Sequence, residues 1–430
     1  MIIIIQKYAG GNPMKRNLNY DVVIVGGGAA GISAALAASK INQKVLLIER
    51  DPSFGGAGVN SQVASYCGFY TRGQKPDLVA GGIGKLVLDK MKEAGINTTA
   101  VPSKSTGNVS IKFDPEKMKI IFDDLLSKSN ADFLLHASVI GARVEEGKIS
   151  TVICSDDDGL FTVHGKEFID ASGNGNLLHA AGLKTNWGDK DGNAQQASLS
   201  FRIDNLPQHA IGMADIEQAV RKGKKAGIKH LTQERGVFLK EPEASYAFLA
   251  APSIKIDSLD SKNMTKYEMK LRKQVQAYFK VIKKYIAGCE NAILTFSGPK
   301  IGIREARRMI GEVELKNEDI LNATKRSDSI GRAAWSLELH HVNNQLEYVC
   351  IPDNEYASIP LGCLKAKGIE NLWGAGRLIS ADHLAQASIR VMGTGFITGQ
   401  AAGVAAALAI NGRTSVEEVR KELVAQGALL

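Results

Sequence analysis

The chain has 430 residues, of which 44% are hydrophobic and 23% charged, and its formal net charge is +8 with a pI near 9.0. This composition excludes a low-complexity or fibrous protein, and the length predicts two domains that share a large core. The five cysteines form no CxxC pair, so we expect no zinc site or other metal site and a reducing, cytoplasmic location.

The chain opens with MIIIIQKYAGG, whose apolar run is too short for a signal peptide and lacks a preceding basic region. The longest later apolar run, AAGVAAALAI, is well short of the roughly 20 residues that a bilayer requires. We therefore expect neither a targeting segment nor a transmembrane segment.

Residues 21–31, DVVIVGGGAAG, join an apolar strand to the pattern Gly26-x-Gly28-x-x-Gly31, and a helix-forming stretch follows. In such a turn the first glycine permits the tight bend, the second lets a pyrophosphate approach the backbone, and the third lets the helix pack on the strand. The N-terminus of the helix then offers free N–H groups to the phosphates. The segment predicts a dinucleotide-binding turn.

A second apolar strand, KVLLIER, carries Glu49 at about the 20-residue spacing at which a carboxylate binds ribose hydroxyls. Gly55 and Gly56 follow shortly afterwards. They indicate either a backbone that passes close to the cofactor or an ordinary loop.

Further along, residues 114–129 predict a helix with Pro115 in its first turn, and residues 131–156 predict two or three strands that include a hairpin. The next strand, KEFIDAS, ends in the small residues Ala171, Ser172 and Gly173. Small side chains are expected where the chain passes a ligand or a neighbouring strand.

Between about residues 185 and 348, alternating strands are mixed with basic helices, which indicates a separate domain that covers the substrate. Lysines and arginines concentrate in residues 221–230 and 266–285. These segments are either solvated faces or surfaces that attract an anionic substrate or a membrane. No nucleic-acid-binding motif accompanies them, so we expect no nucleic acid partner.

The C-terminal part returns to the first pattern. The strand NLWGAG leads to Gly376 and Arg377, Asp382 follows, and a second glycine-rich turn at residues 393–395 opens a long helix. One ligand with two polar ends would fit both glycine-rich turns.

These segments together resemble FAD-dependent oxidoreductases of the glutathione-reductase-like superfamily, in the branch related to fumarate reductase and succinate dehydrogenase flavoproteins. The resemblance rests on GGGAAG with Glu49, on the glycine pair, and on IDASGNG, IGIREARRMIGE, AAWSLELHH and GAGR…RVMGTGFITGQAAG. The chain departs from the family at Gly393, Gly395 and Glu338, where relatives often carry proline, cysteine and aspartate.

The resemblance implies an α/β fold. A Rossmann-like FAD-binding domain, with a parallel sheet and a β-meander, would comprise residues 18–184 and 351–415, and an α+β substrate or cap domain would comprise residues 185–350. In that family the first turn holds the FAD pyrophosphate, the acid binds the adenosine ribose, and the C-terminal glycine turn lies beside the isoalloxazine. The expected cofactor residues are Gly26, Gly28, Ala29, Ala30, Gly31, Glu49, Arg50, Gly55, Gly56, Ala57, Val139, Ala171, Ser172, Gly173, Gly376, Arg377, Asp382, Gly393, Thr394, Gly395 and Phe396.

The resemblance also implies exchange of a hydride between flavin N5 and a small organic substrate, for which an anionic compound is a candidate. Arg304, Arg307, His340 and His341 would bind the substrate and move the accompanying proton. Structural roles are open for the same residues. Arg308 lies at helical spacing for an ion pair with Glu305 or Glu312, and one histidine of the adjacent pair would face the core if both lie on a strand.

Two other functions stay open: a single-component-type FAD monooxygenase, and a non-catalytic flavin-binding protein that uses its basic face for a partner. A disulfide reductase would need a second GxGxxG and a CxxxxC pair, which the chain lacks. We assume non-covalent FAD, with NAD(P)H as a candidate transient reductant. The sequence leaves the substrate, the direction of electron flow and the oligomeric state open.

Overall fold

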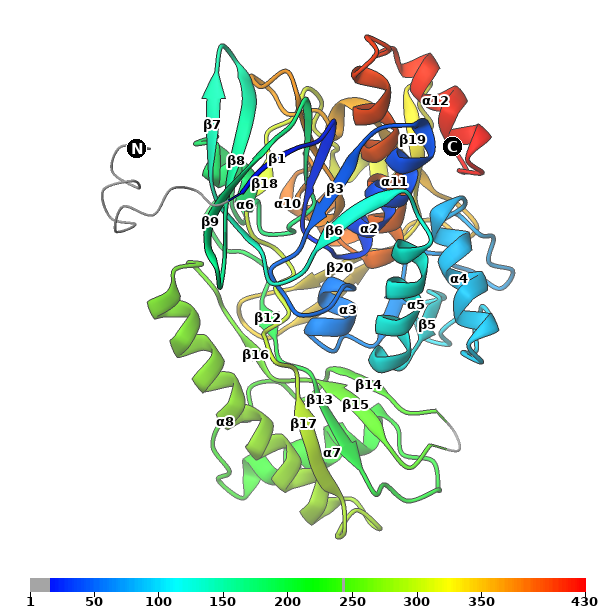
Figure 1. Ribbon diagram of the computed structural model, residues 1–430. Helices are drawn as coiled ribbons and strands as arrows, with labels where there is room; N and C mark the ends of the chain where they lie inside the picture. The colour runs from blue at the N-terminus through cyan, green and yellow to red at the C-terminus, as the bar shows by residue number, and fades with distance from the viewer. Residues whose placement is uncertain (1–15, 242–243) are drawn as a thin grey trace.

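The computed structural model describes residues 16–241 and 244–430. The opening apolar run, for which we predict no targeting role, lies outside the described residues. The fold has two parts, a larger one built on a parallel sheet and a smaller one that carries the long helix α8 (Ser261–Tyr285), drawn below it in Figure 1.

The larger part is centred on a five-stranded parallel sheet with the order β23-β10-β2-β3-β6. Its strands β2 and β3 read VVIV and VLLI and are buried throughout, as expected for parallel strands that are covered on both faces. The predicted α/β class with a Rossmann-like sheet is confirmed. The strands are β2 (Val22–Val25), β3 (Val45–Ile48), β6 (Ala131–Leu134), β10 (Glu167–Asp170) and β23 (Leu372–Gly374).

Two helices, α2 (Ala29–Ala38) and α11 (Met392–Ala409), pack against each other beside this sheet. Their backbones are in direct contact, because a Cβ on Gly399 would lie 2.1 Å from the carbonyl oxygen of Ala30, and a Cβ on Gly403 would lie 2.3 Å from that of Ala34. Both helices are almost entirely buried. The pair places the N-termini of two segments that are far apart in the sequence next to each other.

A second sheet has the order β1-β9-β8-β7 and packs on the other face of the parallel sheet. The predicted strands of residues 131–156 are confirmed as β6, β7 and β8, and a tight turn joins β7 to β8. In this second sheet, β7, β8 and β9 are consecutive antiparallel neighbours and form the expected meander. Their bounds are β1 (Asn17–Asn19), β7 (Ser138–Glu145), β8 (Lys148–Asp156) and β9 (Gly159–His164).

The smaller part is an antiparallel sheet with the order β14-β15-β13-β17, covered by α7 and α8. Its separate hydrophobic core draws on residues from Ala197 to Ile301, whereas Leu315 and the residues after it pack into the core of the larger part. The domain limits at residues 185 and 350 stay a prediction. The elements are α7 (Met213–Lys225), β13 (Phe201–Asp204), β14 (Val237–Leu239), β15 (Ala247–Ala250) and β17 (Ile293–Ser297).

The remaining elements complete the larger part and join the two parts. They are α3 (Gly56–Asn60), β4 (Ser65–Cys67), α4 (Ile83–Glu93), β5 (Ser110–Lys112), α5 (Pro115–Ser127), α6 (Asn176–Ala180), β11 (Thr185–Asn186), β12 (Ala197–Ser198), β16 (Ser253–Ile254), β18 (Arg308–Met309), α9 (Asn317–Leu321), β19 (Ser329–Ala333), β20 (Leu337–His340), β21 (Leu346–Val349), β22 (Ala357–Pro360), α10 (His383–Ile389) and α12 (Val416–Ala425), with short 3₁₀ helices η1 (Ser39–Ile41), η2 (Leu361–Cys363) and η3 (Gly376–Leu378).

The helical spacing that we inferred for Arg304 and Arg308 is wrong. Residues 301–307 are not helical, and Arg308 belongs to the short strand β18, which pairs with β11. This segment passes between the two parts, and its contacts with both of them determine its conformation.

Among the described residues, no single helix is long and apolar enough to span a membrane, and only the sharply bent pair α10 and α11 meets the criteria of length and composition.

Candidate functional site

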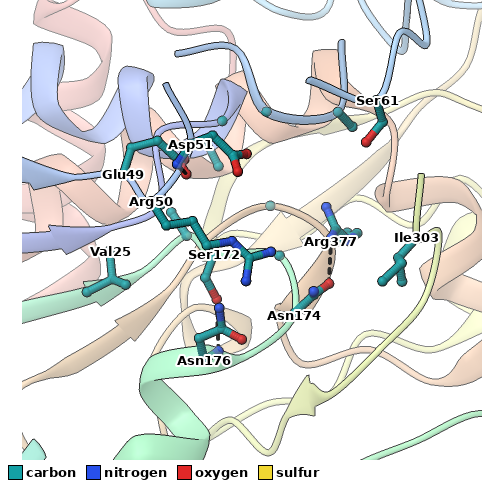
Figure 2. Close-up of a pocket in the computed structure, with 18 of the residues that line it drawn as sticks. Val25, Glu49, Arg50, Asp51, Ser61, Ser172, Asn174, Asn176, Ile303 and Arg377 are labelled. Carbon is teal, nitrogen blue, oxygen red and sulfur yellow. Dashed lines mark hydrogen bonds between the residues drawn. The ribbon is translucent and has the colours of Figure 1, made fainter. Parts of the chain in front are cut away.

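A cavity of about 630 Å³ lies at the carboxyl ends of β2, β3 and β10 and is closed on its far side by residues of the smaller part. Ligands bind at this edge of open parallel sheets. Of the residues predicted to bind the cofactor, those that line the cavity are Gly26, Gly28, Ala29, Ala30, Glu49, Arg50, Gly56, Ala57, Val139, Ala171, Ser172, Gly173, Gly376, Arg377 and Gly395. Figure 2 shows Arg50 and Arg377 extending toward the same space from different elements.

The three glycines of the first turn differ in what surrounds them. A Cβ on Gly26 would lie 2.6 Å from the Ser172 backbone, and one on Gly31 would lie 1.7 Å from the carbonyl oxygen of Gly26, so these two permit close packing of the protein itself. A Cβ on Gly28 would meet only the Cα atom of Gly56, at 3.6 Å. Gly28 therefore leaves open space on the cavity side.

Helix α2 begins at this turn with its N–H groups available. Its N-cap, Gly28, supplies no side-chain hydrogen bond, and no acidic residue lies in the first turn. The first N–H groups of a helix lack partners within the helix and attract anions. The arrangement suits a phosphate in the cavity.

Glu49 lies directly after β3 and is only 6% exposed. Its carboxylate accepts hydrogen bonds from the backbone N–H of Gly27 at 2.5 Å and of Asp51 at 2.9 Å. These bonds fix the acid at the cavity wall, where its oxygens can also accept hydroxyl protons. The neighbouring Asp51, which the sequence analysis missed, lines the same wall and forms an ion pair with Lys300 of the loop after β17.

Arginines line the middle of the cavity. Arg377 donates from Nη2 to Oδ1 of Asn174 at 2.8 Å (Figure 2), and Arg307 donates to the carbonyl oxygen of Asn174 at 3.1 Å. Burial lowers the pKa of Arg377 to about 10, with a smaller contribution from the charge of Arg50, so Arg377 stays protonated near neutral pH. The Nε of Arg377 has no hydrogen-bond partner in the structure. This wall favours an anion.

Several residues predicted to bind the cofactor do not line the cavity. The Asp382 carboxylate caps α10 through the N–H of Ala385 at 2.7 Å and accepts the N–H of Asn317 at 2.8 Å. Gly393 packs against the backbone of Cys67 and Gly68, where a Cβ would lie only 2.5 Å away.

Close packing within the protein also explains why the other predicted cofactor residues do not line the cavity. Thr394 and Phe396 are fully buried, and the Phe396 ring packs against aromatic rings that include Tyr66. Gly31 and Gly55 contact the protein itself, because a Cβ on Gly55 would lie 2.2 Å from the Val59 side chain. In the structure these residues are packed within the protein and support the residues that line the cavity.

Of the four residues predicted to act on the substrate, only Arg304 and His340, which come from separate segments, are brought near each other, and the charge of Arg304 acts on the His340 ring. Arg307 lines the cavity, whereas Arg304 donates to the carbonyl oxygen of Gln196 at 2.6 Å and to Oγ of Ser198 at 2.7 Å. His340 is buried at the end of β20, whereas His341 follows the strand and is partly exposed, beside Glu347 at 2.8 Å. Because His341 lies outside the strand, the expected alternation does not apply to this pair, and neither histidine lines the cavity.

His340 lies behind the cavity wall against Glu338, with 3.1 Å between Nε2 and the carboxylate. Burial, together with the charge of Arg304, lowers the pKa of His340 to about 3. Burial alone would raise the pKa of Glu338, but the hydrogen bond from His340 and the charge of Arg390 lower it. At neutral pH, His340 is therefore neutral and donates its Nε2–H to an ionised carboxylate.

The buried pair of His340 and Glu338 predicts that the folded protein loses stability in acid. The unfolded chain takes up a proton on His340 near pH 6.5, whereas the folded chain does so only near pH 3. Between these two pH values the unfolded state binds more protons than the folded state. The free energy of unfolding therefore falls as the pH falls. Replacing His340 by glutamine keeps a donor but removes the titration. We expect His340→Gln to lose less stability than the parent between about pH 7.5 and about pH 5, measured by urea denaturation without flavin. An equal loss in both proteins would contradict this account.

Sequence reasoning missed the residues that come from far along the chain. Leu259, Met264, Ile301 and Ile303 of the smaller part line the cavity, and so does Arg390, two residues before α11. A signal existed for Arg390, because it lies three residues before Gly393 of the second glycine-rich turn. None existed for the apolar residues, whose placement depends on how the two parts pack.

Comparisons with known proteins agree with this geometry. The profile of the family described as "FAD dependent oxidoreductase" matches residues 21–427. Digeranylgeranylglycerophospholipid reductase of Thermoplasma volcanium is 26% identical over 166 residues, which are 36% of this chain and 39% of that protein. Digeranylgeranylglycerophospholipid reductase 2 of Methanothermobacter thermautotrophicus is 27% identical over 179 residues, 40% of this chain and 45% of that one.

The matched segment thus spans less than half the length of these two relatives. Among solved structures, BexE, studied for oxidation during BE-7585A biosynthesis, is similar with a TM-score of 0.50 and 11% identity, over 95% of this chain and 66% of that one. At this identity the likeness shows the fold alone. Because the family profile covers nearly the whole chain, this protein belongs to the FAD dependent oxidoreductase family.

Proposed function

We propose that the chain binds one FAD non-covalently in the cavity and exchanges a hydride between the flavin and a small organic substrate. The observation that carries the proposal is the meeting of two uncapped helix N-termini, those of α2 and α11, at one cavity that also holds a buried acid at one end. An extended dinucleotide needs such a set of groups.

The residues present fit FAD. Glu49 would accept the ribose hydroxyls, with Arg50 and Val139 beside the adenine. The N–H groups of α2, with Arg377, would bind the pyrophosphate. The unpartnered Nε of Arg377 and the open space over Gly28 are what an anionic ligand would fill. When bound, FAD supplies a ring that takes up or gives two electrons.

The chain's own residues bind and orient the ligands and exclude water. Ile301, Ile303 and Met264 give the cavity an apolar cover from the smaller part, which keeps bulk water away from the reacting atoms. The buried, neutral His340 lies behind the wall and supports the ionised Glu338. We therefore reassign His340 and His341 from proton transfer to structural roles, and retain Arg307 as the substrate-side residue of the predicted set.

The finer family placement is also a proposal. The segments around Arg304 and Glu338 support a relationship to the fumarate reductase and succinate dehydrogenase branch. The relatives named reductases support reduction of the substrate as the direction of electron flow. The division into a flavin domain and a cap domain is supported by the two separate hydrophobic cores.

The visible spectrum of the purified protein tests the proposal, followed by anaerobic mixing with NADH, NADPH and a panel of small acids and alcohols. We expect flavin bands that an organic substrate bleaches or, if the flavin is first reduced, restores. Acid precipitation should leave the yellow colour in the supernatant. Absence of flavin bands after incubation with FAD would refute the proposal. Reoxidation by oxygen that an aromatic compound accelerates would replace it with the monooxygenase.

A further inference from the structure

A buried cluster of charged and polar residues backs the cavity near the N-terminus of α11. We call it the Glu338 cluster, and its members are Arg304, Trp335, Glu338, His340, Tyr348 and Arg390. The Glu338 carboxylate accepts hydrogen bonds from Trp335 at 3.2 Å and Tyr348 at 3.1 Å, in addition to that from His340. Glu338 is only 7% exposed, so its carboxylate is held within the protein.

Glu338 holds Arg390 at two points. The Nη2 atom of Arg390 lies 3.4 Å from a carboxylate oxygen of Glu338 and donates to the backbone carbonyl oxygen of the same residue at 2.9 Å. Both contacts are made by Nη2, so they anchor one edge of the planar guanidinium, whose fork of donors has a defined geometry. Arg390 is the member of the Glu338 cluster that lines the cavity.

The charges of the cluster do not balance. Arg304 and Arg390 carry two positive charges, Glu338 carries one negative charge, and His340 is neutral, which leaves one positive charge. Within the described residues, Arg304 forms no direct ion pair and donates only to neutral oxygens. A buried net charge is costly unless an opposite charge compensates it.

The unused hydrogen-bonding capacity is on Arg390. Its Nε atom is buried and has no hydrogen-bond partner among the described residues, and the side chain is only 11% exposed. An unpaired buried donor of a charged group costs free energy that a ligand acceptor would recover. The excess positive charge belongs to the cluster as a whole, and the free donor belongs to Arg390, the member of the cluster that borders the cavity.

We propose that Arg390, held in position by Glu338, binds a negatively charged group of the cavity ligand at the α11 end, and that this charge neutralises the Glu338 cluster. The proposal rests on the proposed function for the identity of its ligand. Two sources share the chemistry: the negative charge that a flavin ring gains, and a carboxylate of the substrate. Arg390 is the binding residue, and Glu338 is a positioning residue that acts through it.

The first arm of the test uses sulfite on the FAD-loaded protein. Sulfite adds through its sulfur lone pair to the oxidised ring, with no leaving group, and places negative charge on the ring. We expect Arg390→Gln to weaken sulfite binding by at least about tenfold, because a unit charge a few ångströms away contributes on that scale. Retention of bound FAD is measured separately by fluorescence. The control is Arg413→Gln, which removes an exposed arginine paired with Glu418.

The second arm measures the binding of succinate. Difference spectra report its binding to the oxidised holoprotein, and a rise in melting temperature reports its binding to the FAD-free protein. A loss of sulfite affinity alone assigns the anion to the flavin, and a loss of succinate binding alone assigns it to the substrate. Unchanged binding of both by Arg390→Gln would overturn the proposal. If wild type binds no FAD, the proposed function fails, and the melting of the FAD-free protein with succinate decides the Arg390 site by itself.

Glu338→Gln tests positioning. If only charge mattered, removing the carboxylate would strengthen anion binding, whereas loss of orientation weakens it. We expect Glu338→Gln to weaken the binding of the same anion, sulfite or succinate, whose binding Arg390→Gln weakens. Combining the two substitutions should cause no further loss of affinity. Stronger binding, or full additivity, would overturn the positioning role. Should Arg390→Gln fail to fold, Arg390→Lys keeps the charge without the fork and is expected to bind the anion with intermediate affinity.

Discussion

Gly28→Val is expected to fold and to lose its flavin. Gly28 has φ −79° and ψ −173°, an extended conformation that valine adopts without strain, and its Cβ would meet only the Gly56 backbone at 3.6 Å. The added methyl groups would occupy the space into which the pyrophosphate is proposed to fit. We expect FAD affinity to fall by about 2 kcal/mol or more, which is about thirtyfold. Flavin content and the dissociation constant measure the effect.

The matched control is Gly31→Ala in the same motif. Its Cβ would lie 1.7 Å from the carbonyl oxygen of Gly26, so even one methyl group forces α2 away from β2. We expect this variant to be destabilised by about 3 kcal/mol, with or without FAD. If Gly28→Val retained normal flavin content, the assignment of this turn to the pyrophosphate would be wrong.

Glu305→Gln is expected to cause the largest loss of stability. Glu305 is fully buried and forms an ion pair with Arg308, and it accepts the backbone N–H of Gln195 at 2.8 Å. Neutralising it leaves the buried Arg308 charge without its direct ion-pair partner. We expect the free energy of unfolding to fall by about 3–5 kcal/mol. Urea denaturation at a fixed FAD concentration measures it, because bound flavin itself stabilises the folded state.

Glu312→Gln provides the comparison for this prediction. Glu312 is exposed, and it was the alternative partner that the sequence offered for Arg308. Its replacement is expected to change stability by no more than about 0.5 kcal/mol. Equal effects of the two substitutions would show that the buried pair contributes little to stability.

The strand, turn and helix of the first glycine motif could be predicted from the sequence because each is specified locally. Four consecutive apolar residues define β2, the glycines define the turn, and the acid after β3 follows at a fixed spacing. The helix after Asp114 could also be predicted, since its cap and Pro115 lie within a few residues of each other. These features need no knowledge of the rest of the fold.

Prediction failed where distant segments decide the structure. The pairing of Arg308 with Glu305 was anticipated and is confirmed, but on an extended segment rather than a helix. That segment contacts both parts, and β18 pairs with β11 more than a hundred residues earlier. The surroundings of His340 could not be predicted either, because only the assembled structure shows that Glu338 and Arg304 lie beside it.

The contact between α2 and α11 determines how far apart the two glycine-rich turns stand. Gly399 and Gly403 hold the helix backbones together at two points one helical turn apart, so neither helix can slide or rotate alone. The separation of the two helix N-termini at the cavity is therefore set by the helices and not by the loops. The length of ligand that the protein accepts is then a property of this helix pair, and changes in the loops that precede the helices would leave it unaltered.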